Sequence, residues 1–304
     1  MTARSELEVL VVGEALVDIV RIGGESSEHV GGSPANVALG LGRRGVAVGL
    51  RTQIAQDARG LAIVERLTAS GVDVLPESMT APATSTARAV VGVDGQAEYE
   101  FDIAWETFPA PIDLAPRVVH TGSIAAFLAP GAGSVVDLLR NADASVITFD
   151  PNVRPSLVGD RAEALRAYES VARLADVVKM SDQDAEWLHP GKSVDQVIDA
   201  VLALGPSLVA ITLGADGAVV ASADHRATIP AVSVAAVDTI GAGDTFMASL
   251  IHSVLEHGPS GLDAAGLQRI GEDATRAAAI TVARAGADLP WAWELEASPK
   301  SSTR

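Results

Sequence analysis

The chain has 304 residues, 48% hydrophobic and 20% charged, and its 22 lysines and arginines against 39 aspartates and glutamates leave a net charge of −17. So acidic a surface repels phosphate backbones and anionic lipids, so we expect neither nucleic-acid nor membrane partners. The absence of cysteine excludes disulfides, thiolate catalysis and cysteine-bound zinc. No apolar run approaches the ~18 residues of a spanning helix, and residues 1–8 lack a signal-peptide core, so we expect a soluble, cytoplasmic protein.

Short apolar runs alternate with helix-like segments along the chain. The expected strands comprise residues 7–13, 118–121, 146–149, 177–180 and 208–213. Helical periodicity follows several of them, as at residues 133–141 and 162–175. This alternation is typical of βα units around a parallel sheet. We therefore predict an α/β fold with a central, mostly parallel sheet flanked by helices, in a single domain over residues 1–304.

One region breaks this alternation. Residues 84–93 and 96–103 are strand-like runs on either side of Asp94-Gly95, a strong hairpin turn signal. A two-stranded hairpin is only marginally stable, so it needs further strands, and residues 18–30 are a candidate partner. Together these segments predict a small β-sheet lid, formed by about 18–30 and 84–107. Its alternating apolar face is too exposed for a lone sheet, so we expect the lid to close over a ligand and a homodimer to form.

The strongest motif is Asp238-Thr-Ile-Gly-Ala-Gly-Asp244, which leads into a helical run at 245–255. A glycine pair at a helix start exposes backbone N–H groups, and the helix dipole adds positive potential, so the segment can bind phosphate without basic residues. Asp244 would stand in the first helical turn, where it could accept a proton from a hydroxyl attacking a phosphoryl group. The structural alternative is that Asp244 only complements the helix dipole.

A second motif, Gly31-Gly-Ser-Pro-Ala-Asn36, opens a helix that runs towards Gly45. Ser33 is expected as the N-cap, Pro34 at the first helical position and Gly45 at the C-terminal cap. These roles are structural and need no ligand. The two glycines and Asn36 remain as a bare backbone and an amide that can contact a polyol.

Taken together, the two glycine motifs resemble the two signatures of the PfkB (ribokinase-like) carbohydrate kinase family. Residues 31–45 are similar to the N-terminal signature, and residues 238–244 match the C-terminal one. The turn Gly214-Ala-Asp-Gly217 matches the family's nucleotide loop, and residues 277–287 resemble its adenine-side helix and turn. The resemblance covers nearly the whole chain. It implies a ribokinase-like fold and ATP-dependent phosphorylation of a sugar hydroxyl.

The resemblance also implies roles for individual residues. Asp244 is implied as the base, beside an anion hole made by the amides of Gly241, Ala242 and Gly243. The residues implied for sugar binding are Asp18, Gly31, Gly32, Asn36 and Arg154. Those implied for ATP binding are Lys179, Ser181, Thr212, Gly214, Gly217 and Ala279. A carboxylate is a sufficient base for this reaction, because the proton can leave after the P–O bond has loosened.

The metal sites implied by the family are only partly matched. The family often has an Asn-x-x-Glu element that helps to place magnesium through water, and the matching residues here are Ser181-Asp-Gln-Asp184. Asp184 keeps a shortened carboxylate, so it is the implied contact for Mg²⁺. Asp238 is implied for a monovalent cation such as K⁺.

The sequence leaves several alternatives for the substrate. Gly13-Glu-Ala-Leu-Val-Asp18 and Asp150-Pro-Asn-Val-Arg154 are similar to fructokinases and to 2-keto-3-deoxygluconate kinases. An anionic substrate would need a basic residue in the lid, and the hairpin at residues 84–108 offers only Arg88, which favours a neutral sugar, fructose first. A nucleoside kinase is the next alternative, with Tyr99, Phe101 and Trp105 stacking on a base, although packing of the lid explains them as well. A weakly catalytic sugar-binding regulatory protein is the alternative from another class.

Overall fold

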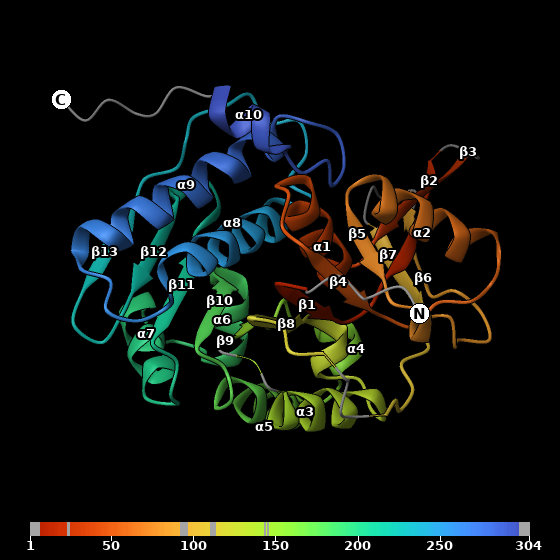
Figure 1. Ribbon diagram of the computed structural model, residues 1–304, viewed down its shortest axis with the longest axis horizontal. Coiled ribbons are helices and arrows are strands. Elements are labelled where there is room, and N and C mark those ends of the chain that lie inside the picture. The colour runs from red at the N-terminus through yellow and green to blue at the C-terminus, as the bar shows by residue number, and fades with distance from the viewer. Residues whose placement is uncertain are drawn as a thin grey trace.

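The computed structural model describes residues 7–22, 25–91, 97–109, 114–142, 144 and 146–297. Its centre is a nine-stranded sheet (Figure 1). The strands, in spatial order, are β13 (Arg226–Ile229), β12 (Ala218–Ala221), β11 (Leu208–Thr212), β10 (Val177–Ser181), β9 (Val146–Asp150), β8 (Val118–Gly122), β1 (Val9–Val12), β4 (Val48–Arg51) and β5 (Val72–Val74). The pairings from β11 to β5 are parallel, and β12 and β13 add an antiparallel edge. The predicted fold class is confirmed.

Helices cover both faces of this sheet (Figure 1). One face carries α1 (Ser33–Arg43), α2 (Ala58–Ala69), α8 (Ala242–His257) and α9 (Ala264–Val282). The opposite side carries α3 (Gly131–Asn141), α4 (Pro155–Val158), α5 (Arg161–Ala172), α6 (Asp182–Leu188) and α7 (Val194–Leu202). The remaining elements are α10 (Ala292–Ala297) and three 3₁₀ turns, η1 (Pro76–Ser78), η2 (Ser123–Ala126) and η3 (Gly214–Asp216). Each face of the sheet has its own buried apolar cluster.

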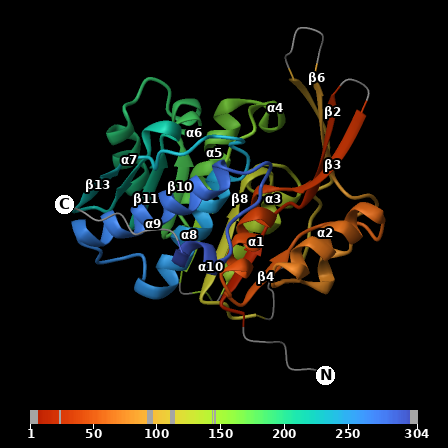
Figure 2. The same cartoon turned by 90° about the horizontal axis from the view of Figure 1, so that it is seen from above.

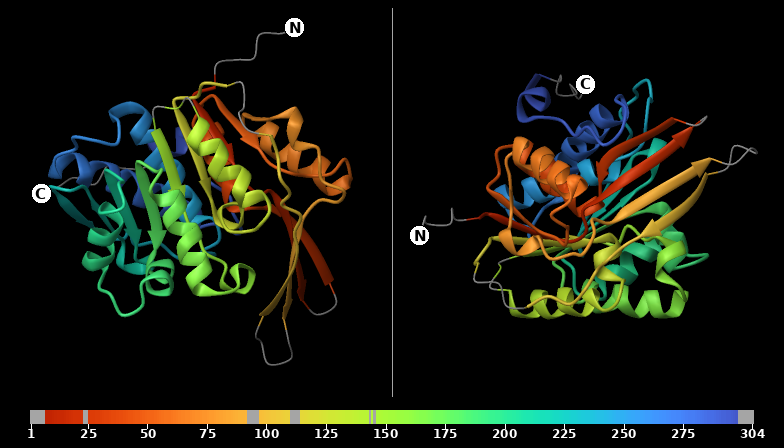
Figure 3. Two further views of the ribbon diagram at one scale, coloured as in Figure 1. Left: turned by 90° about the horizontal axis from the view of Figure 1, so that it is seen from below. Right: turned by 90° about the vertical axis from the view of Figure 1, so that its right-hand side faces the viewer.

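A separate four-stranded sheet extends from one end of the large one (Figures 2 and 3). Its strands, in spatial order, are β3 (Glu25–Gly31), β2 (Leu16–Ile22), β6 (Thr86–Val91) and β7 (Ala97–Asp102). The two predicted hairpin strands are present and antiparallel, while the Asp94-Gly95 turn lies outside the described residues. Strand β2 begins at Leu16, two residues before the predicted start, because Leu16 already pairs with Gly31.

The register of the small sheet decides which side chains share a face. Asp18 pairs with Ala87, and Ala87 pairs with Phe101, so these three lie on one face. Arg88 is the next residue along β6 and therefore lies on the opposite face. Ala87 and Phe101 pack in a cluster with Ile124 of η2, which turns the Asp18 face towards the large domain.

Trp105 does not have the exposed position that stacking on a base would require. It is 2% exposed, its Nε1 donates to the Ala125 carbonyl at 3.2 Å, and its ring packs edge-on against Phe108. Trp105 therefore packs in a core cluster of the large sheet, where its ring is buried and its N–H has a partner, and not within the lid as the packing alternative had it. The side chain of Tyr99 lies outside the described residues. None of the described helices combines the length and apolar character needed to cross a bilayer.

Candidate active site

Asp244 joins the two glycine motifs, which are about two hundred residues apart in the chain. Its Oδ1 accepts a hydrogen bond from Ser33 Oγ at 2.7 Å, and its Oδ2 accepts one from Asn36 Nδ2 at 2.8 Å. The residue is 7% exposed and lies in the first turn of α8, while its two partners come from the start of α1. The contacts between α1 and α8 thus place a carboxylate against the segment expected to bind the polyol.

The expectation for Ser33 is wrong in one respect. Helix α1 begins at Ser33, its N-cap is Gly32, and no side-chain cap bond is formed. The Ser33 hydroxyl donates to Asp244 instead, and a charge-assisted hydrogen bond is stronger than a neutral capping bond. The C-cap is Arg44 and not Gly45, which follows it with φ +80° and donates its N–H to the Gly42 carbonyl, the position after the cap that glycine favours.

The start of α8 has the geometry expected of an anion-binding site. Gly241 is the N-cap, with φ +80°, and a Cβ built on it would lie 2.8 Å from the Cβ of Ala287. Only glycine fits such a backbone. Ala242 and Gly243 follow as the first two helical residues. The Ala242 N–H donates to the Thr239 carbonyl at 3.2 Å, whereas the Gly243 N–H has no partner within the helix. The Gly243 amide and the dipole of a 16-residue helix favour an anion next to Asp244.

Asp18 and the first glycine of the N-terminal motif are in close contact. A Cβ on Gly31 would lie 2.1 Å from Asp18 Oδ2, so a larger residue there would displace the carboxylate. Burial raises the pKa of Asp18, and the charge of Asp244 adds to the rise, while Arg154 and His29 oppose it. Asp18, Gly31, Gly32 and Asn36, all predicted for the sugar, are therefore brought together beside Asp244.

Arg154 reaches the same region but is already engaged. Its Nη1 donates to Asn152 Oδ1 at 2.6 Å and to the Asn152 carbonyl at 3.0 Å. Its charge opposes the rise that burial causes in the pKa of Glu14 and of Asp18, so Arg154 lies close to both carboxyl groups. Arg88, the other predicted cation near the substrate, is exposed on the far face of the small sheet.

The residues predicted for ATP fall into two groups. Thr212 ends β11, Gly214 and Gly217 bound the following turn, and Gly217 has φ +94°. Ala279 lies near the end of α9, the helix that packs on β12 and β13. Lys179 is separate from these and lies in β10 beneath the start of α8. Strand ends of parallel sheets are where ligands bind in open α/β folds.

Ser181 and Asp184 form a capping box at the start of α6. Asp184 Oδ2 accepts from the Ser181 backbone N–H at 3.0 Å and from Ser181 Oγ at 2.7 Å, and its Oδ1 accepts from the Val153 N–H at 2.8 Å. The carboxylate therefore holds β10, α6 and the segment after β9 together. No cluster of three or more metal-ligating side chains occurs in the described part of the chain.

Asp238 links two loops near the anion site. Its Oδ1 accepts from the Ile240 N–H at 3.0 Å, and its Oδ2 accepts from the Gly286 N–H at 2.9 Å. Its own N–H donates to the Val282 carbonyl at 3.2 Å. Both oxygens of Asp238 therefore accept backbone N–H groups, and the carboxylate fixes the segment before α8 against the turn at Gly286.

Sequence reasoning missed two buried carboxyl groups, Glu14 and Asp150. Glu14 Oε2 accepts from the Ala125 N–H at 3.2 Å, and Asp150 Oδ2 accepts from Lys179 Nζ at 2.9 Å. Burial raises the pKa of Glu14 to about 7 and that of Asp150 to about 6. Both residues lie at the carboxyl end of an expected strand, and an ionisable residue there is the signal that identifies them.

Glu14→Gln is expected to stabilise the protein at alkaline pH. Because the folded state binds the Glu14 proton more tightly than the unfolded chain, stability falls as the pH rises from 4.5 to about 7. Glutamine cannot ionise, so the variant should exceed the native protein by about 3 kcal/mol at pH 8 and match it near pH 4.5. Urea unfolding at both pH values measures this. Glu65→Gln, on the exposed side of α2, is the control, and an equal gain in both variants would contradict the prediction.

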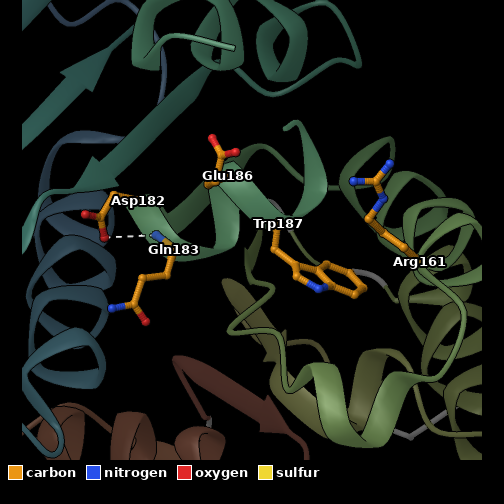
Figure 4. Close-up of a pocket in the computed structure, with 5 residues that line it drawn as sticks. All are labelled: Arg161, Asp182, Gln183, Glu186 and Trp187. Carbon is orange, nitrogen blue, oxygen red and sulfur yellow. Dashed lines mark hydrogen bonds between the residues drawn. The ribbon is translucent and has the colours of Figure 1, made fainter. Parts of the chain in front are cut away.

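A cavity of about 520 Å³ opens beside α6 (Figure 4). Its lining residues are Arg161, Asp182, Gln183, Glu186 and Trp187. Asp182 and Gln183 directly follow Ser181, so the cavity adjoins the carboxyl end of β10. None of the residues predicted from the sequence lines it.

An open parallel sheet with an anion site at a helix start, beside a buried carboxylate, defines a small-molecule phosphotransferase of the α/β class. The family model "pfkB family carbohydrate kinase" matches residues 6–294. The chain belongs to this family.

Named relatives agree with this membership. The chain is 35% identical over 262 residues to a fructokinase of Rhizobium leguminosarum bv. trifolii, covering 81% of this chain and 79% of the relative. It is 31% identical over 305 residues to a fructokinase of Escherichia coli, covering 95% and 98%. Among solved structures, the fructokinase of Vibrio cholerae O395 bound to fructose, ADP and calcium superposes with a TM-score of 0.81 at 25% identity, covering 96% and 98%. The aminoimidazole riboside kinase of Salmonella enterica, at 24% identity and a TM-score of 0.79 over 95% and 98%, shares the fold.

Proposed function

We propose that this chain is an ATP-dependent kinase that phosphorylates a hydroxyl of a neutral sugar, with fructose as the preferred substrate. The observation that carries the proposal is the pair of hydrogen bonds from Ser33 and Asn36 to Asp244. They bring the polyol-binding segment, a carboxylate base and the backbone anion site to one point. The fructokinases among its relatives support the choice of sugar.

In this mechanism Asp244 orients the sugar hydroxyl and takes its proton as the hydroxyl attacks the γ-phosphoryl group. Ser33 and Asn36 fix the carboxylate by donating to both of its oxygens. The amides of Gly241, Ala242 and Gly243 receive the negative charge that develops on the transferred group. The other hydroxyls are held by Asp18, Asn36 and the backbone of Gly31 and Gly32. Positioning of the sugar therefore supplies most of the rate enhancement.

The nucleotide is assigned to the carboxyl ends of β10 and β11. The residues proposed for it are Lys179, Ser181, Thr212, Gly214, Gly217 and Ala279. Mg²⁺, when bound, would neutralise phosphate charge, and Asp184 would hold it through water. Asp150 Oδ1, buried and without a hydrogen-bond partner among the described residues, is a further carboxylate oxygen that fits this need. Asp238 would contribute a carboxylate to a site for a monovalent cation such as K⁺.

The charges around the sugar site favour a neutral substrate. Asp18, Glu14 and Asp244 contribute carboxyl groups. The charge of Arg154 acts on Glu14 and Asp18, His29 acts on Asp18, and Lys179, already paired with Asp150, acts on Asp244. Arg154 is already bonded to Asn152, and Arg88 lies on the other face of the small sheet. A desolvated carboxylate or phosphate on the substrate would be poorly paired here, at a cost of several kcal/mol.

We therefore expect kcat/KM with Mg²⁺-ATP to be higher for fructose than for 2-keto-3-deoxygluconate. A coupled kinase assay over neutral hexoses, keto-sugar acids, sugar phosphates and nucleosides measures the order. A higher kcat/KM for 2-keto-3-deoxygluconate than for fructose, with that preference lost in Arg154→Ala, would favour the 2-keto-3-deoxygluconate kinase instead. Nucleoside turnover above sugar turnover would promote the nucleoside kinase, and no turnover with any of them would favour the regulatory sugar-binding protein.

We propose that the small sheet (about 18–30 and 84–107) acts as a lid on a single kinase domain (1–304) and that the protein is a homodimer. The sheet has two edge strands, β3 and β7, which can pair with another chain. Small-angle scattering is expected to give a dimer that becomes more compact on adding fructose. A monomer of unchanged radius would contradict both parts.

A further inference from the structure

A buried ion pair lies directly beneath the anion site. Lys179 Nζ and Asp150 Oδ2 are 2.9 Å apart, and the two residues are 3% and 0% exposed. Lys179 lies in the middle of β10, and Asp150 is the last residue of the neighbouring strand β9. Burying two charges is seldom the most stable choice for a core, since apolar residues of similar volume are often as good or better. A pair in this position therefore calls for a functional explanation.

The ammonium group is in contact with the start of α8. A Cβ built on Gly243 would lie 2.9 Å from Lys179 Nζ, and Nζ is the one atom within 4 Å of it outside the helix's own nearby backbone and the adjoining residues. A side chain at this position would therefore meet the ammonium, and glycine leaves room for it. Lys179 supports the turn whose N–H groups face the anion.

Lys179 is also the cation among three carboxylates. Its ammonium is bonded to Asp150, and its charge also acts on Asp184 and Asp244. His120, on the neighbouring β8, adds no charge, because burial lowers its pKa to about 3. Without the ammonium, the anion site would stand over uncompensated negative charge, which repels phosphate.

We propose that Lys179 is a positioning residue of the anion site. Held by Asp150, its ammonium supports Gly243 from below and offsets the neighbouring carboxylates, so that the amides of α8 can stabilise charge on the transferred phosphoryl group. This inference rests on the proposed kinase function. It assigns to Lys179 an effect on the chemical step that acts through α8, in place of the direct contact with ATP given to this residue under the proposed function.

The first test replaces the pair by neutral residues of similar size, Asp150→Asn with Lys179→Met, which leaves no lone buried charge. We expect thermal unfolding close to the native protein, a kcat lower by roughly 100- to 1,000-fold, and KM values for fructose and ATP within about threefold. Lys192→Met, at an exposed lysine, is the matched control. A kcat near the native value, or a loss confined to the KM for ATP, would overturn the inference.

The second test is a double-mutant cycle between Lys179 and Gly243. Gly243→Ala should lower both the unfolding temperature and kcat in the native background, because its methyl group meets the ammonium. In a Lys179→Ala background, prepared with Asp150→Asn, the same substitution should change either quantity little. Equal effects in both backgrounds would contradict the contact. If the native protein phosphorylates no sugar, the proposed function fails, and the unfolding cycle still decides whether Lys179 supports α8.

Discussion

Asp244→Asn is expected to lower kcat by roughly two to four orders of magnitude while sugar binding is retained. Asparagine has the same shape, so its Oδ1 can accept from Asn36 and its Nδ2 can donate to the Ser33 hydroxyl. The backbone anion site does not depend on the side chain. Only the group that takes the proton is lost. Steady-state kinetics with fructose and ATP measure the fall, and isothermal titration with fructose measures retained binding.

Asp182→Asn is a suitable control, since Asp182 is an exposed aspartate in the first turn of another helix of the same domain. Its kcat should stay close to the native value. Near-native turnover in Asp244→Asn would mean that Asp244 only complements the dipole of α8. A large drop in unfolding temperature in that variant would instead indicate that its bonds to α1 are chiefly structural.

Gly31→Ala is expected to lower kcat/KM for the sugar by roughly 100-fold. The new methyl carbon would stand 2.1 Å from Asp18 Oδ2, so the carboxylate must leave its position. Asp18 lies on the face of the small sheet that is turned towards the large domain, and hydrogen bonds to charged groups contribute about 1.5–3 kcal/mol each. The loss should appear mainly in the KM for fructose, with the KM for ATP nearly unchanged.

Gly133→Ala provides the matched control for this substitution. Gly133 is exposed in α3, and a Cβ there has no heavy atom within 4 Å. Alanine also favours a helix, so stability should rise slightly and activity should not change. If Gly31→Ala binds fructose as well as Gly133→Ala does, Asp18 is not a sugar ligand.

Local sequence determined much of the fold. The apolar runs after residues 7, 118, 146, 177 and 208 became β1, β8, β9, β10 and β11, because uninterrupted apolar stretches of that length fit the buried interior of a parallel sheet. The Asp94-Gly95 signal located the hairpin strands β6 and β7, and the two glycine motifs located the starts of α1 and α8. Each of these features depends on a few consecutive residues, so it can be read without knowledge of the rest of the chain.

Only the tertiary structure decided how those pieces act together. Serine is a residue type favoured at N-caps, yet the Ser33 hydroxyl donates to Asp244, a residue from the far end of the chain. Whether Arg88 faces the sugar depends on strand register, and whether Trp105 is exposed depends on what packs over it. The pairing of Lys179 with Asp150 beneath Gly243 arises from strand order and helix placement. Long-range contacts of this kind depend on how the whole chain is packed, because charge compensation and burial are properties of neighbours in space.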